Sequence, residues 1–137
     1  MMLEAAARSD GLKAVVSEGA GIRSVREGAD APNAGLLSNL SWAIQTVGVS
    51  LFSNEAVPRN LLDLMPEIAP TPILLIYASE GQGGEELNAD YYEAAGKPKD
   101  VWEVPEGGHV GSQDAFPQEY ERRVIGFFDA ALLGERG

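Results

Sequence analysis

The single histidine of this chain, His109, is the side chain best suited to acid–base chemistry near neutral pH. It lies in the glycine-rich segment Gly107-Gly108-His109-Val110-Gly111, which follows a short alternating apolar run. Glycines on both sides let the backbone turn sharply and present the imidazole ring. A carboxylate bonded to one ring nitrogen would leave the other nitrogen free to take a proton from a nucleophile. We therefore interpret His109 as a general base rather than as an ordinary polar loop residue.

Three glutamates, Glu80, Glu85 and Glu86, are candidates for the carboxylate that orients this histidine. They lie in a glycine-rich loop after the buried strand expected at 73–77, and the carboxyl ends of neighbouring parallel strands meet at one edge of a sheet. Glu80 is nearest to the end of that strand. Glu85 and Glu86 also suit the first turn of a helix, where acidic side chains interact favourably with the helix dipole.

A nucleophile to accompany His109 is not evident. The Gly-x-Ser-x-Gly pattern, which places a serine on a sharp turn between a strand and a helix, does not occur in the 137 residues. Ser17 follows an expected strand but lacks the first glycine, and Ser50 lies in a helical pattern. Ser17 and Ser112 would be the first serines to test.

Helical and extended patterns alternate along the chain, which predicts an α/β fold with parallel strands and right-handed crossovers. Apolar periodicity and capping residues predict helices at 1–8, 36–51, 60–68 and 85–95 and from Pro117 onward, and strands at 12–17, 73–77 and 101–104. Because the run at 73–77 is continuously apolar, we expect that strand to be buried on both faces. Three strands make a thin sheet.

The long uncharged stretch from Ala31 to Asn54 is too polar in its middle for a convincing membrane span. An interfacial amphipathic helix is an alternative, but the polar face lacks Lys and Arg. We favour a helix that packs on the domain, so membrane association is not expected. The start of the chain has neither the basic residues nor the long apolar run of a secretory leader, which favours a cytoplasmic location.

Composition excludes several other classes of protein. The net charge of −11, without a basic cluster, argues against binding to nucleic acid. One histidine and no cysteine cannot form a zinc site, and we expect no cofactor. The turn Gly19-Ala20-Gly21 only half matches a dinucleotide-binding fingerprint, because the third glycine is missing.

From Pro72 to Leu133 the sequence resembles the C-terminal part of the α/β-hydrolase superfamily, near its dienelactone-hydrolase-like and related esterase or acyltransferase branches. The resemblance is carried by the strand at 72–76, the stretch 91–96, the segment 101–111 (VWEVPEGGHVG) and the final helix. It implies that His109 is the catalytic histidine. The family's triad acid follows the preceding strand, where this chain has no aspartate, so Glu80 and Glu85 are the first candidates.

The same resemblance sets our expectations for the domain. Residues 1–8 resemble the helix that follows the family's nucleophile elbow, so we expect 1–137 to be the C-terminal portion of a single α/β-hydrolase domain, with the N-terminal half of the fold absent. Residues 21–70 would form a helical, cap-like insertion over the site.

Together these observations predict a serine-type hydrolase for a small-molecule ester or related acyl substrate, represented here by its histidine and acid and inactive alone. The alternative is a non-catalytic binding or interaction module derived from a truncated hydrolase, which could associate with itself through an exposed sheet edge.

Overall fold

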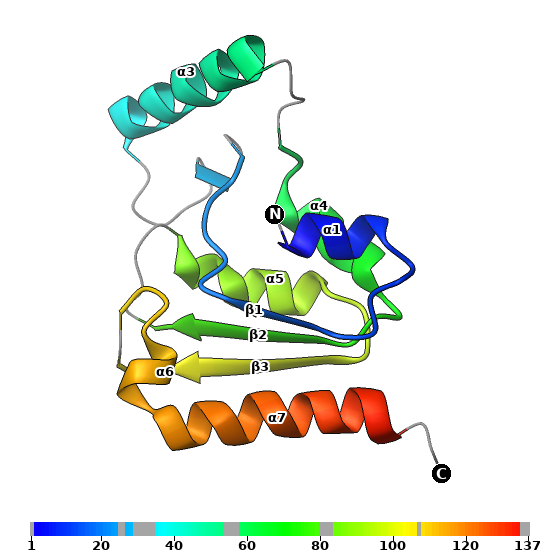
Figure 1. Ribbon diagram of the computed structural model, residues 1–137. Helices are drawn as coiled ribbons and strands as arrows, with labels where there is room; N and C mark the ends of the chain where they lie inside the picture. Colours follow the sequence, from blue (N-terminus) through cyan, green and yellow to red (C-terminus); the bar gives the residue numbers. More distant parts are fainter. Residues whose placement is uncertain are drawn as a thin grey trace.

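The computed structural model describes residues 2–24, 27–28, 35–53, 58–79, 84–106 and 108–134. Its centre is a parallel sheet of β1 (Val15–Glu18), β2 (Ile73–Ala78) and β3 (Lys99–Val104), in the order β1-β2-β3 (Figure 1). In register, Val16 is opposite Leu74 and Leu74 is opposite Asp100. The predicted parallel sheet with three strands is confirmed.

The central strand β2 is buried along its whole length because helices cover both faces of the sheet. β3 instead alternates: Trp102 and Val104 are buried, whereas Asp100 and Glu103 are exposed. β1 is shorter than the strand predicted at 12–17 and begins three residues later.

Three helical segments cover one face of the sheet (Figure 1). They are α1 (Met2–Arg8), α4 (Leu61–Leu64) with the 3₁₀ turn η1 (Met65–Ile68), and α5 (Asn88–Ala94), which follows the 3₁₀ turn η2 (Glu85–Leu87). The core on this face consists of Leu3, Ala6, Val15, Leu61, Leu64, Met65, Ile68, Ile73, Leu75, Leu87, Tyr91 and Ala95. The part of the expected cap at 60–68 therefore belongs to the core.

The other face of the sheet is covered by α7 (Pro117–Leu133), as Figure 1 shows. Its apolar side, with Tyr120, Val124 and Phe127, packs against Trp102 and neighbouring strand residues. Arg123 lies over the ring of Trp102, 5.0 Å from the ring centre. The helix predicted from Pro117 is confirmed, whereas the short helix α6 (Ser112–Ala115) before it was not predicted.

Glu119 on α7 provides a pH-dependent contribution to stability. It accepts hydrogen bonds from Arg122 Nε at 2.8 Å and Arg123 Nε at 2.6 Å, and these two arginines lower the pKa of Glu119 from 4.5 to about 2. A carboxyl whose pKa is lower in the folded state stabilises the fold above its unfolded pKa and loses that contribution as the pH falls toward the folded value. We expect Glu119→Gln to have a lower free energy of unfolding than the wild type at neutral pH, measured by urea denaturation. This difference should disappear as the pH falls from 4.5 to about 2. A difference that stays constant down to pH 2 would contradict this assignment.

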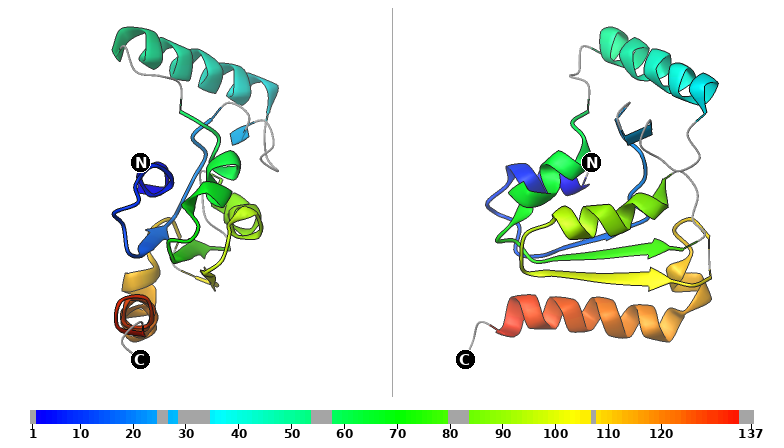
Figure 2. Two further views of the ribbon diagram at one scale, coloured as in Figure 1. Left: turned by 90° about the vertical axis from the view of Figure 1, so that its right-hand side faces the viewer. Right: turned by 180° about the vertical axis from the view of Figure 1, so that it is seen from behind.

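The long helix α3 (Leu36–Ser53) stands apart from the sheet and its covering helices in every view (Figures 1 and 2). Its exposed apolar residues are Leu36, Leu37, Leu40, Ile44, Val47, Val49, Leu51 and Phe52. The predicted helix is confirmed, but the expectation that it packs on the domain is wrong for the part of the chain that the structure describes. Periodicity identifies an apolar face and not the surface that covers it. No helix of the described residues is long and apolar enough to cross a membrane.

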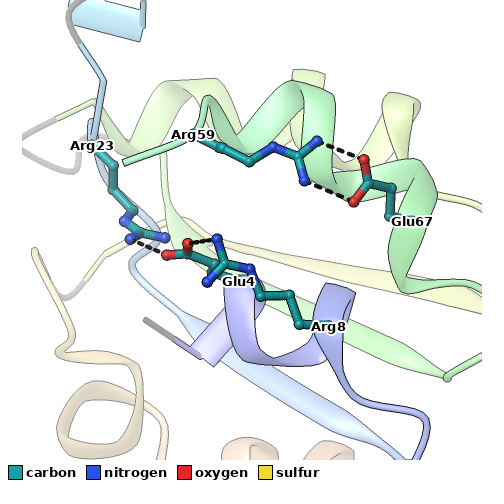
Figure 3. Close-up of polar contacts among 5 residues, drawn as sticks. All are labelled: Glu4, Arg8, Arg23, Arg59 and Glu67. Carbon is teal, nitrogen blue, oxygen red and sulfur yellow. Dashed lines mark hydrogen bonds and ion pairs between the residues drawn. The ribbon is translucent and has the colours of Figure 1, made fainter. Parts of the chain in front are cut away.

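Figure 3 shows two groups of ion pairs, one that joins α1 to the segment after β1 and one that joins the segment before α4 to η1. Glu4 on α1 bonds to Arg8 one turn later and to Arg23 after β1, each at 2.8 Å. The hydrogen bond from Arg23 is the main cause of the lowered pKa of Glu4. Arg59 and Glu67 form a bidentate pair at 2.6 and 3.0 Å, but this pair is exposed and is expected to add little stability.

Candidate catalytic site

The carboxyl ends of β1, β2 and β3 lie at one edge of the sheet, as parallel pairing requires (Figure 1). The segments that leave these ends are joined there by backbone bonds: Gly19 N–H donates to Ile76 O at 2.9 Å and Ser79 N–H donates to Val104 O at 3.0 Å. This edge therefore brings the glutamate-containing loop and the histidine-containing loop together, as the sequence predicted.

Glu85 is placed by the end of β2 and by the turn before it. Gly84 adopts a left-handed conformation, with φ of 87°, and the chain then enters the 3₁₀ turn that begins at Glu85. The side chain of Glu85 is 1% exposed. Its Oε2 accepts a hydrogen bond from the backbone N–H of Ala78 at 3.0 Å. The carboxylate is thereby fixed against the last residue of β2.

Asn88, at the start of α5, holds the backbone of Glu85 in place. Its Nδ2 donates to the carbonyl oxygens of Glu85 at 2.8 Å and of Ala20 at 2.7 Å. The side chain is fully buried, so these bonds form away from competing water. Asn88 therefore links the acid to the segment that follows β1.

Gly84 should not tolerate a side chain. A Cβ at this position would lie 2.3 Å from Cγ1 of Ile22, and the left-handed φ disfavours any L residue with a Cβ. We expect Gly84→Ala to lower the free energy of unfolding by about 2 kcal/mol, measured by urea denaturation. Gly48→Ala is the control, because among the described residues a Cβ there has no heavy atom within 4 Å apart from its own helix backbone and chain neighbours. It should be neutral or slightly stabilising. Equal effects of the two changes would contradict the prediction.

The loop that carries His109 lies on the turn after β1. Gly108 and Gly19 both have φ of 63°, and Val110 has φ of 55°, in the region that side chains with a Cβ rarely adopt. A Cβ at Gly19 would lie 3.2 Å from the Cε1 and Nδ1 atoms of the His109 ring. Glycine at position 19 is therefore what allows the imidazole to approach the end of β1 so closely.

The structure brings His109 and Glu85 together. Nδ1 of the ring is hydrogen-bonded to Oε1 of Glu85, while the other carboxylate oxygen stays on the Ala78 N–H. The His109 side chain is 56% exposed, so the ring reaches from a buried acid toward solvent. An ionised carboxylate only accepts hydrogen bonds, so donation from the ring to an ionised Glu85 requires the proton on Nδ1. In the neutral imidazole this leaves Nε2 as a proton acceptor.

Of the other two predicted acids, the structure describes only Glu86. Glu80 lies outside the described residues. Glu86, next to Glu85 in the same 3₁₀ turn, is partly buried and is not bonded to the His109 ring in the described part of the chain. The alternative role for Glu85, that it only stabilises a helix dipole, does not account for its buried carboxylate, which is directed to Ala78 and His109.

Neither candidate serine is a partner of His109 among the described residues. Ser17 is buried within β1, at 7% exposure. Ser112 is also buried, and its backbone N–H donates to Oε1 of Glu18 at 3.0 Å. Within the same ranges, no three His, Asp or Glu side chains are grouped so that they could hold a metal ion.

Sequence reasoning missed Glu18 and Asn88, which support the site without belonging to a motif. Glu18 directly follows the strand predicted at 12–17, and Asn88 follows Glu85 by three residues. Spacing along the chain gives no signal for the contact of Glu18 with Ser112, which lies 94 residues later.

Comparison with solved structures identifies this architecture. The α/β hydrolase GrgF from Penicillium sp. sh18 superimposes with a TM-score of 0.64 at 14% sequence identity, over 96% of this chain and 60% of the GrgF chain. The fold is an α/β-hydrolase fold. A hypothetical protein of Pseudomonas aeruginosa, PA2218, superimposes with a TM-score of 0.60 at 22% identity, over 95% of this chain and 57% of that structure. The predicted partial α/β-hydrolase fold is confirmed.

Sequence comparison adds little about activity. The uncharacterized protein PA2218 of Pseudomonas aeruginosa is 36% identical over 77 residues, which is 53% of this chain and 19% of that protein. No model of a protein family matches the chain. The chain thus spans about a fifth of the length of this sequence relative and 57–60% of the two solved structures. The dienelactone-hydrolase branch and the assignment to a C-terminal half stay predictions.

Proposed function

We propose that this chain provides the histidine and the acid of a serine-type hydrolase that acts on an ester or related acyl substrate. The observation that carries the proposal is the buried Glu85 carboxylate bonded to Nδ1 of the half-exposed His109. His109 is the general base, and Glu85 holds its ring in the Nδ1–H form. The α/β-hydrolase fold supports this reading, because both residues follow adjacent parallel strands at the edge where such sheets bind ligands.

In the proposed reaction, Nε2 of His109 takes the proton of a nucleophilic hydroxyl as that oxygen attacks the acyl carbon. The resulting imidazolium is stabilised by Glu85, which faces it without water between them. His109 then returns the proton to the leaving group. The nucleophile is proposed to lie outside these 137 residues, since no Gly-x-Ser-x-Gly sequence occurs within them. The same origin is proposed for the donors of the oxyanion hole.

The arrangement of the proton on the ring is the direct test. Because the chain has one histidine, its ring nitrogens give a single set of signals in a long-range ¹H–¹⁵N spectrum. Recorded in alkaline buffer, the spectrum should show the Nδ1–H tautomer, and Glu85→Gln should weaken that preference. Glu86→Gln is the matched control and should leave it unchanged. A ring that carries its proton on Nε2 in the wild type would contradict the proposal.

We expect the 137-residue chain alone to hydrolyse a generic activated ester no faster than its His109→Ala variant, measured with a chromogenic acetate ester. The reason is that a histidine and an acid without a nucleophile give no efficient acyl transfer. A clear loss of activity in His109→Ala would show that a nucleophile is present in the chain. Ser17 and Ser112 would then be replaced first.

The second candidate function is a non-catalytic module that associates with a second copy of itself. It is favoured by α3, whose 18 residues carry no charge and leave Leu36 86% and Phe52 95% exposed. In this case Leu40→Glu and Ile44→Glu, both at exposed positions, would convert a dimer into a monomer in sedimentation experiments. A wild-type chain that is already monomeric would exclude this alternative.

A further inference from the structure

Glu18, the last residue of β1, spans the gap between the sheet and the histidine loop. Its Oε1 accepts a hydrogen bond from the backbone N–H of Ser112 at 3.0 Å. Ser112 is the first residue of α6 and follows His109 by three residues. The bond therefore attaches the far end of the histidine loop to the strand next to β2.

The near end of the same loop is attached independently. β3 ends at Val104. Ser79 donates two hydrogen bonds to the Val104 carbonyl oxygen, one from its backbone N–H at 3.0 Å and one from its side-chain hydroxyl at 3.3 Å. Between the anchors at Val104 and Ser112, His109 is held by its contact with Glu85. Among the hydrogen bonds named here for the described residues, only the bond from Ser112 to Glu18 ties the part of the loop after His109 to β1.

The loop requires such an anchor because its backbone is strained. Val110, directly after His109, is β-branched and adopts φ of 55°. A β-branched residue in this region is a conformational outlier that persists only when the surrounding structure imposes it. The Val110 side chain lies against the turn after β1: its Cγ2 atom would be 3.1 Å from a Cβ placed on Gly19. Released from its anchor, the loop would relax and carry His109 with it.

The same carboxylate also faces α7. Burial raises the pKa of Tyr120, and the Glu18 carboxylate beside its hydroxyl adds to the rise. Tyr120 belongs to the apolar side of α7 that packs on the sheet. Glu18 thus has donors from two segments, α6 and α7, near one side chain.

We propose that Glu18 is a positioning residue, which keeps His109 on Glu85 by anchoring the Ser112 N–H against the strain at Val110. This inference rests on the proposed function, because it assigns Glu18 a role through His109. No hydrogen bond joins Glu18 to the His109 ring among the described residues. It acts by restricting the loop, so that Nδ1 stays directed at the buried acid and Nε2 stays directed outward.

The test uses two measurements on the intact 137-residue chain: amide hydrogen exchange at Ser112 and the tautomer of the His109 ring. In Glu18→Ala we expect exchange at the Ser112 amide to accelerate about tenfold or more, since a bond to a charged acceptor is lost. The share of the Nδ1–H tautomer should fall in the same variant. Glu18→Gln keeps an acceptor oxygen of similar reach and should change both quantities in the same direction by less, which provides a test if Glu18→Ala does not fold.

Tyr120→Phe is the matched control, because it removes the other donor near Glu18 and leaves the Ser112 bond intact. It should not change the tautomer. Folded Glu18 variants with an unchanged Nδ1–H tautomer would overturn the positioning role, as would an equal change in Tyr120→Phe. Failure of the proposed function is distinguishable, because the wild-type ring itself would then lack the Nδ1–H tautomer.

Discussion

Replacing Glu27 by alanine should lower the free energy of unfolding by about 3 kcal/mol, a large part of the total for a domain of this size. Glu27 is fully buried, and its carboxylate accepts hydrogen bonds from the backbone N–H groups of Arg23, Ser24 and Leu61. In return, Ser24 Oγ accepts from the Glu27 N–H at 3.1 Å, which completes a capping box. The bond to Leu61 joins this turn to the start of α4. Without the carboxylate, these buried donors would lose their partner.

Urea denaturation measures this effect as a shift of the midpoint at constant slope. Ser24→Ala removes only the reciprocal bond and should cost about 1 kcal/mol. Glu67→Gln is the control for loss of a glutamate charge, and its exposed pair with Arg59 should contribute little to stability. If Glu27→Ala were no worse than Glu67→Gln, Glu27 would not have the structural role that its contacts indicate.

The second large effect concerns activity. In a longer protein or complex that supplies the nucleophile, we expect Glu85→Gln to lower kcat by about 10³–10⁴. Glutamine has nearly the shape of glutamate, but its amide cannot hold the imidazole in the same tautomer or stabilise the imidazolium. The measurement is steady-state hydrolysis of an activated ester, with folding checked by circular dichroism.

Glu86→Gln is the matched variant, because it removes the same charge from the adjacent position without touching the His109 ring. It should stay within a few-fold of the wild type, while His109→Ala should lose at least as much activity as Glu85→Gln. If Glu86→Gln were as damaging as Glu85→Gln, the effect would be one of net charge near the site. The assignment of Glu85 as the orienting acid would then be wrong.

The elements that the sequence predicted correctly are those with strong local patterns. The strand at 73–77 could be read from five consecutive apolar residues, and the structure adds only Ala78. The last helix could be read from Pro117 and the apolar periodicity after it, and α7 begins at that residue. These patterns depend on which residues face the core, so they are visible without knowing what the core is.

Element boundaries and short elements were less predictable. β1 occupies 15–18 and not 12–17, because pairing with β2 begins only at Val15. The predicted helix at 85–95 starts instead as the 3₁₀ turn η2 at Glu85–Leu87, and α5 continues it only to Ala94. α6, with four residues, is too short to have a periodicity.

For the candidate site, the sequence by itself determined the type of residue and the edge of the sheet. His109 between glycines after a strand, and glutamates after the preceding strand, already implied that an imidazole and a carboxylate meet there. Only the tertiary structure decided between the carboxylates it describes. It selected Glu85 over Glu86 because the Gly84 turn and the Asn88 bonds direct one side chain inward, and these constraints involve segments distant in sequence.

Only the tertiary structure shows the contact of Glu18 with Ser112, since a bond between a strand and a loop 94 residues later leaves no trace in local spacing. It likewise divided the region predicted as a cap: Leu61, Leu64, Met65 and Ile68 pack in the core, whereas α3 lies apart from it. Local patterns report the period of apolar residues along one element, because neighbouring side chains share its geometry. Which carboxylate is buried, and what covers a helix, depend on long-range packing, which is decided when the whole chain folds.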